Sequence, residues 1–125
     1  GQRIDDFLPA GIQRMMAPGA GGPLIDLVKA AVVTMRPETF RAAIAAIARY
    51  EGRDVLPLIK CPVLGIAGEL DATAPANVME KMASKISGAE HVTMPAVGHF
   101  GWAEKPDAFN RHVIEFLASR CEGPA

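Results

Sequence analysis

The sequence lacks an excess of charge of either sign, a long apolar run and a signal-like N-terminus. A formal net charge of −1 provides no electrostatic surface for nucleic acid or an anionic membrane. No apolar run approaches the roughly 20 residues that a membrane helix needs. Arg3, Asp5 and Asp6 interrupt the stretch that would be apolar in a signal peptide. We therefore expect a cytoplasmic protein with no nucleic-acid or membrane partner.

Cysteine is scarce, and its two positions do not form a metal-ligand pattern. Cys61 and Cys121 are expected to be free thiols in a reducing compartment. Cys61 precedes a predicted buried strand and is expected to act as a small apolar residue. The glycine-rich stretch 17–22 is not a phosphate loop, because no strand precedes it and no Gly-Lys-Ser/Thr follows. No metal or organic cofactor is predicted.

Hydrophobic residues make up 50% of the sequence, and in its first half they recur at helical spacing. Pro23 suits the first position of a helix that runs to Met35. Pro37 stops that helix and starts another, and both are expected to bury one face and expose the other. Residues 1–22 are the least regular, with one or two helical turns predicted from Gly11 to Met16.

The second half contains the stretch that organises the chain. Residues 62–68 and 90–94 read as two short strands with a helix over 75–86 between them, and a last helix begins near Pro106. The first strand lacks polar alternation, which is typical of a strand covered on both faces. A strand–helix–strand crossover makes the two strands parallel neighbours whose carboxyl ends lie on the same side. The predicted fold class is therefore α/β.

Each predicted strand is followed by an ionisable residue, Asp71 after the first and His99 after the second. We expect them to meet at the rim of the sheet, where open α/β folds keep their chemistry. An Asp beside a His is the orienting half of a nucleophilic triad. Glu69 is a competing acid that is expected to face away, and His91 and His112 are expected to be surface or core residues. Alternatively, Asp71 is a helix cap or salt-bridge partner and His99 an ordinary loop histidine.

Two parallel strands with one crossover helix do not make a stable sheet, because parallel sheets occur with several strands and both faces covered. Alone, the pair would leave an unpaired edge and a large apolar face in water. Either identical chains complete the sheet or another polypeptide supplies the missing strands.

From about Arg36 to Leu117 the sequence resembles the C-terminal part of α/β-hydrolase-fold enzymes. The residues that carry the resemblance are Leu56 to Leu64, Gly68-Glu69-Leu70-Asp71 with Pro75, Gly98-His99, Glu104, Pro106, Phe109 and Phe116-Leu117. Among capped members the chain is most similar to the 3-oxoadipate enol-lactonase group and its esterase relatives. The resemblance implies that residues 1–53 are a cap-derived helical segment. It also implies that residues 54–125 form the C-terminal part of the core, with the last two strands.

In that family the nucleophile precedes the acid and the histidine along the chain. Asp71 matches the acid and His99 the histidine, but the sequence has no Gly-x-Ser-x-Gly and no oxyanion loop. The serines lie in predicted helices or at their ends: Ser84, Ser87 and Ser119. The resemblance thus implies a companion N-terminal hydrolase chain with the serine elbow and oxyanion hole, separated by proteolysis, gene splitting or design. The expected function is hydrolysis of a small-molecule ester or lactone, with this chain inactive alone.

Further site residues are suggested near the histidine. Phe100 and Trp102 are candidates for shaping the substrate pocket, but for Trp102 packing under the last helix is the favoured role. Met15, Met16 and Met35 are expected to be packing residues, with Met16 as a candidate substrate-binding residue because flexible thioethers also line adaptable pockets. Glu104 is expected to cap the last helix.

Two other classes of function stay open. The same framework supports carbon–carbon bond hydrolysis, cofactor-free haloperoxidase or perhydrolase chemistry, and epoxide hydrolases or dehalogenases with an aspartate nucleophile. These differ at the nucleophile, which the sequence does not contain. A non-catalytic module that binds a partner through its sheet edge would instead tolerate Asp71→Asn and His99→Ala.

Overall fold

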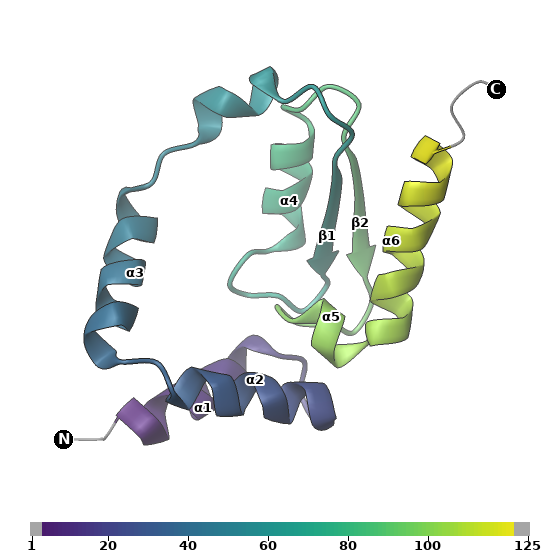
Figure 1. Ribbon diagram of the computed structural model, residues 1–125. Helices are drawn as coiled ribbons and strands as arrows, with labels where there is room; N and C mark the ends of the chain where they lie inside the picture. Colours follow the sequence, from purple (N-terminus) through teal and green to yellow (C-terminus); the bar gives the residue numbers. More distant parts are fainter. Residues whose placement is uncertain (1–3, 122–125) are drawn as a thin grey trace.

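The computed structural model describes residues 4–121. In chain order the elements are α1 (Ile4–Met15), α2 (Pro23–Val33), α3 (Pro37–Arg49), the 3-10 helix η1 (Arg53–Leu58), β1 (Leu64–Gly68), α4 (Ala76–Ala83), β2 (Glu90–Met94), α5 (Gly101–Glu104) and α6 (Pro106–Cys121). Figure 1 shows the two strands side by side between α4 and α6, with α1 and α2 beyond the carboxyl ends of the strands.

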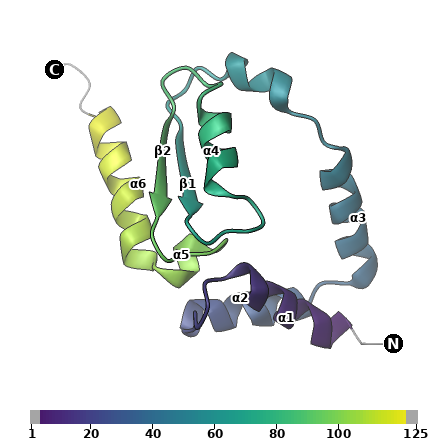
Figure 2. The same ribbon diagram turned by 180° about the vertical axis from the view of Figure 1, so that it is seen from behind.

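The sheet consists of β1 and β2, which pair in parallel with a register that runs from Leu64 opposite Glu90 to Gly68 opposite Met94. The predicted α/β class and the parallel crossover are confirmed. Helix α4 forms the crossover and lies against one face of the sheet, and α6 lies on the other side (Figure 2). A side chain at Gly65 would collide with the Met79 side chain of α4, which occupies the space that glycine leaves beside the strand.

The N-terminal helices form a second layer next to the loop that follows β2. Met16, Ile25 and Ala103 are buried together there, with Phe100 packed against them. Helix α1 is longer than the one or two turns predicted from the sequence. Pro9 and Gly11 lie inside it, and both residue types weaken a helix interior, so they concealed its extent.

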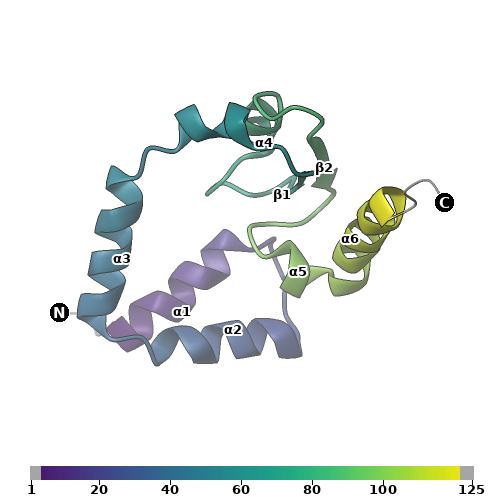
Figure 3. The same ribbon diagram turned by 45° about the horizontal axis from the view of Figure 1, so that its top comes forward.

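Helix α3 stands apart from the sheet, between α2 and η1 (Figures 1 and 3). It is amphipathic as predicted, yet it buries no residue, and Ile44 and Ile47 are 50% and 70% exposed. The prediction that this helix buries one of its faces is therefore wrong for the described structure. The apolar side of α3 has no neighbour within residues 4–121 that covers it.

Cys61 has a free thiol, as expected, but it is exposed. The expectation that it packs as a small apolar residue is wrong, because β1 begins only at Leu64 and the turn before the strand faces solvent. The thiol of Cys121 lies outside the described side chains. Between residues 4 and 121, no helix is both long enough and apolar enough to span a bilayer.

Candidate active site

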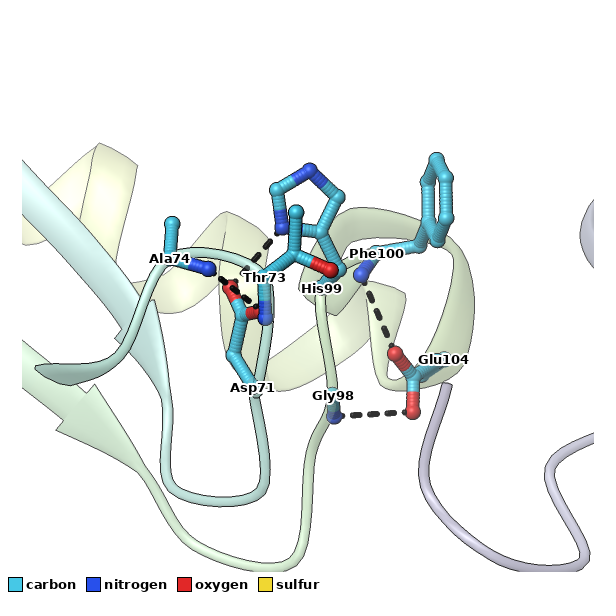
Figure 4. A network of polar contacts seen from close by, with 7 residues as sticks. All are labelled: Asp71, Thr73, Ala74, Gly98, His99, Phe100 and Glu104. Atoms are coloured by element: carbon cyan, nitrogen blue, oxygen red, sulfur yellow. Dashed lines mark hydrogen bonds and ion pairs between the residues drawn. The ribbon is translucent and has the colours of Figure 1, made fainter. Parts of the chain in front are cut away.

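Asp71 and His99 lie in the loops that follow β1 and β2 (Figure 4). The loops are joined to each other, since the Leu70 N–H donates to the Val97 carbonyl at 2.8 Å. Gly68 ends β1 at a point where an added Cβ would collide with the carbonyl oxygens of Val97 and the next residue. The absence of a side chain at Gly68 thus lets the two loops lie against one another.

The structure brings the two predicted ionisable residues together. The Nδ1–H of His99 donates to Oδ2 of Asp71 across 2.8 Å. The Asp71 side chain is 6% exposed and the His99 side chain 32%. The second ring nitrogen, Nε2, points away from Asp71 (Figure 4). The carboxylate is therefore enclosed, while the imidazole has one nitrogen engaged and the other directed outward.

Asp71 is fixed by its own loop as well. Its Oδ1 accepts the backbone N–H groups of Thr73 at 2.8 Å and Ala74 at 2.9 Å. Burial is the largest single influence and acts to raise the pKa of Asp71, but the hydrogen bonds from Ala74, His99 and Thr73 together outweigh it and lower that pKa below 3.8. Near neutral pH the group is a carboxylate, which only accepts hydrogen bonds. The proton between the two residues therefore belongs to Nδ1, so in the neutral imidazole it is Nε2 that presents a lone pair.

Glu104 has a role that the sequence did not indicate. Its Oε2 accepts the N–H groups of Ala17 at 2.8 Å and Gly98 at 3.0 Å, and its Oε1 accepts that of Phe100 at 3.1 Å. The expected cap of the last helix is therefore wrong, because both oxygens are used on either side of His99 and on a segment near the start of the chain. A separation of 87 residues between Glu104 and Ala17 left no local sequence signal for this contact.

The aromatic residues after the histidine lie in a row. The Phe100 ring is edge-on to the His99 ring at 5.2 Å and to the Trp102 ring at 6.4 Å. Trp102 is 46% exposed, so the favoured expectation that it packs under the last helix is wrong. Met16 is buried beside Ile25 in the packed cluster. The expected substrate contacts of Phe100, Trp102 and Met16 stay predictions.

The remaining polar candidates lie elsewhere. The Glu69 carboxylate accepts the Ala96 N–H at 2.8 Å and is engaged there rather than with His99. His91 and His112 line a small cavity between β2 and α6. Among the residues that the structure describes, no three His, Cys, Asp or Glu side chains gather in a way that would hold a metal ion.

Comparison with solved structures identifies the class to which this arrangement belongs. The chain matches a thermophilic esterase from Thermogutta terrifontis with a TM-score of 0.80 and 27% identity, over 94% of this chain and 45% of the esterase. It matches a hydrolase from Pseudomonas aeruginosa PA01 with a TM-score of 0.80 and 31% identity, over 93% and 45%. An enol-lactonase from Burkholderia xenovorans LB400 matches with a TM-score of 0.76 and 25% identity, over 90% and 45%. The fold is that of the α/β-hydrolases.

The sequence narrows this class further. Residues 47–121 match the family described as TAP-like protein, and the chain belongs to this family of α/β-hydrolase enzymes. A curated protein, "Putative carbamate hydrolase RutD" from Caulobacter sp. (strain K31), is 30% identical over 82 residues, which are 66% of this chain and 31% of that protein. The chain thus spans about a third of this curated relative and less than half of the solved ones.

Proposed function

We propose that this chain supplies the acid and the histidine of a Ser-His-Asp triad that hydrolyses carboxylic esters or lactones. The observation that carries the proposal is the 2.8 Å hydrogen bond from His99 Nδ1–H to the buried Asp71 carboxylate, with Nε2 free. This is the arrangement that a general base needs, because Asp71 fixes the tautomer and His99 keeps a lone pair for the nucleophile's proton. The serine and the oxyanion hole come from a companion N-terminal hydrolase chain.

The proposed reaction uses the His99 Nε2 lone pair twice. Nε2 takes the proton of the serine hydroxyl as its oxygen attacks the substrate carbonyl carbon, and Asp71 stabilises the imidazolium that forms. When the tetrahedral intermediate collapses, the acyl C–O bond breaks and Nε2–H returns the proton to the leaving oxygen. A water molecule, deprotonated by Nε2, then attacks the acyl-enzyme and releases the carboxylic acid and the serine.

The residue types of the two strands favour a companion strand next to β1. β1 carries only apolar residues and glycine, from Leu64 to Gly68, whereas β2 exposes Glu90, His91 and Thr93. Charged and polar residues are typical of a natural edge strand, and an apolar strand is typical of the sheet interior. The unpaired edge of β1 is therefore the one that suits a further strand.

A broad cavity supports the same conclusion. It has a volume of about 820 Å³ and lies between η1 and α4. Its apolar lining is contributed by Val55, Leu56, Ile59, Val78 and Met82. Together with the exposed Ile44 and Ile47 of α3, this surface leaves several large apolar side chains in water, and contiguous exposed apolar residues mark interaction sites. A companion polypeptide that completes the sheet would also cover part of it.

The substrate class rests on the relatives. The matched proteins are named an esterase, an enol-lactonase and a carbamate hydrolase. All three chemistries deliver a nucleophile to a carbonyl carbon and expel a heteroatom leaving group. An uncharged phenyl ester and an enol-lactone are the substrates to assay first, with a carbamate as a third arm.

The test compares variants of the assembled protein. His99→Ala should lower ester turnover about 10⁴-fold, the loss seen when a triad member is disabled. His91→Ala is the matched control, because His91 is exposed on β2 and should leave turnover unchanged. Equal ester turnover in the parent and in His99→Ala would overturn the assignment, and absence of turnover in the assembled parent would favour a binding module.

The companion is tested separately by intact mass spectrometry of the purified protein. A second polypeptide of about 120–150 residues with a serine elbow is expected, given the usual size of this class of domain. A folded particle with no further polypeptide beside β1 would contradict the shared site. Turnover by this chain alone would contradict it as well.

A further inference from the structure

The His99 loop is connected by direct contacts to the segment 15–17, which is the last residue of α1 and the two residues after it. The His99 N–H donates to the Met15 carbonyl at 2.7 Å. At Gly98 an added Cβ would lie 2.5 Å from the Met15 oxygen and 2.7 Å from the Ala17 nitrogen, so the two backbones touch with no room for a side chain. The side chain of Met16 is buried beneath this contact, at 5% exposure. The segment and the loop therefore form one packed unit.

Glu104 is the side chain that joins the two parts of this unit. One carboxylate accepts N–H groups from residue 17 and from the two residues that flank His99, Gly98 and Phe100. The backbone on both sides of the histidine is thereby held against a single rigid group (Figure 4).

The three hydrogen bonds require a carboxylate rather than an amide. Both oxygens act as acceptors, Oε2 for two donors and Oε1 for one. A glutamine at this position would turn an NH₂ group toward at least one backbone N–H, and two donors cannot bond to each other. A partly buried N–H that loses its acceptor costs free energy, so the local backbone would move to recover a partner.

We propose that Glu104 is a positioning residue for His99 and couples the orientation of the imidazole to the position of the α1–α2 pair. Its importance for catalysis rests on the proposed function above. Its effect on the His99 ring does not. A shift of the segment 15–17 is transmitted to His99 through Glu104 and through the Met15 carbonyl. The N-terminal helices thus set the angle at which Nε2 meets a substrate.

The experiment is ¹⁵N NMR of the histidine rings near neutral pH, in the whole protein and in Glu104→Gln. In the parent, His99 should show the tautomer with the proton on Nδ1. In Glu104→Gln this signal should shift toward the average of the two tautomers. Glu80→Gln, which removes the same charge from an exposed site on α4, should leave it unchanged. A His99 spectrum identical in Glu104→Gln and the parent, with the fold retained, overturns the proposal.

Two further measurements separate the possible failures. If Glu104→Gln does not fold, hydrogen exchange of the unaltered protein decides. Protection of the Ala17, Gly98 and Phe100 amides as one group supports the unit, and free exchange of Ala17 refutes it. If the protein turns over esters, Glu104→Gln should lower kcat by about 10- to 100-fold with little change in KM, as expected for a misplaced catalytic group. Absence of turnover in the parent would count against the proposed function and leave the NMR test intact.

Discussion

Asp71 and His99 are held by different neighbours, and this difference decides what a substitution at each does. Asp71 depends on its own loop, through the Thr73 and Ala74 N–H groups. His99 depends on a distant segment, through the Met15 carbonyl. Substitution at Asp71 should therefore act locally on charge and tautomer. Changes around His99 should also be felt by the N-terminal helices.

Asp71→Asn should lower the free energy of unfolding near neutral pH, and the difference from the parent should shrink in acid. The folded-state pKa of Asp71 is lowered below 3.8, so its stabilisation is present above that value and is lost as the pH falls through the folded pKa. Urea unfolding of both proteins at about pH 7 and about pH 3 measures this. A difference that widens in acid would contradict the ionised state assigned to Asp71.

Gly98→Ala should lower the free energy of unfolding by about 1–3 kcal/mol, the usual cost of forcing atoms into an occupied site. The added Cβ would lie 2.5 Å from the Met15 oxygen. Gly11→Ala is the control, because Gly11 lies within α1 with no atom within 4 Å of an added Cβ. Gly11→Ala should raise the free energy of unfolding by about 0.4–1 kcal/mol. Denaturant midpoints compare the two, and a neutral Gly98→Ala would show that the contact is loose.

The sequence predicted the pair of site residues but not what supports them. Asp71 and His99 follow from one rule, that parallel neighbouring strands end on the same side. Glu104 does not follow from any rule of local pattern, because its partner Ala17 lies far along the chain. Cys61 was predicted to pack as an apolar residue because it lies near a strand. Its exposure is instead set by the turn before the strand, in which it lies.

At the scale of elements, the turn after β2 contains a strained residue. Ala96 follows Pro95 in this turn with a φ of 54°, and it is the one non-glycine residue with positive φ among those described. Its N–H donates to the Glu69 carboxylate, which holds the turn against the end of β1. The strained residue thus lies where the loops after β1 and β2 begin.

Ala96→Gly should raise the free energy of unfolding by about 0.5–1 kcal/mol. Relief of the left-handed backbone at this position would stabilise the folded state by about 1–2 kcal/mol. The greater freedom of glycine in the unfolded chain would offset about 0.4–1 kcal/mol of this stabilisation. Thermal unfolding of the variant and the parent measures the difference. A large loss would mean that the Ala96 methyl makes contacts that outweigh the strain.

The elements themselves were predictable to different degrees. The helices that begin at Pro23, Pro37 and Pro106 have helical periodicity and proline starts, and the two strands are short runs between turn residues. The structure contains all of them at nearly the predicted bounds. For α1 the sequence predicted only a turn or two, because Pro9 and Gly11 lie within the helix. For α3 the pattern identified the apolar face correctly, but an amphipathic pattern does not say what covers that face.

At the scale of the whole molecule, the main feature is the unpaired edge of β1. The Glu90 N–H donates to the Val63 carbonyl and the Glu69 N–H to the Met94 carbonyl, so the odd-numbered residues of β1 direct their backbone groups toward β2. Because these groups alternate along a strand, those of Leu64 and Ile66 face the open edge. Their environment reports directly on whether a further strand is present.

Hydrogen exchange should therefore distinguish neighbouring residues of one strand. In this chain alone, the Leu64 and Ile66 amides should exchange much faster than those of Gly65 and Ala67. If the proposed companion pairs with β1, all four should be protected in the complex, since an added parallel strand would accept the outward N–H groups. Slow exchange at Ile66 in the isolated chain would show that the edge is already covered, for example by a second copy.

The acid–histidine pair is held by backbone groups and a carboxylate that all belong to this one polypeptide. The arrangement of these two residues thus forms without the proposed nucleophile. It is therefore compatible with more than one N-terminal hydrolase half. Chimeras that join this chain, with the Met15 carbonyl and the Ala17 N–H retained, to the front halves of different relatives should keep the same arrangement of Asp71 and His99. They should differ in the bond they attack, so that the choice of reaction is inherited from the other parent.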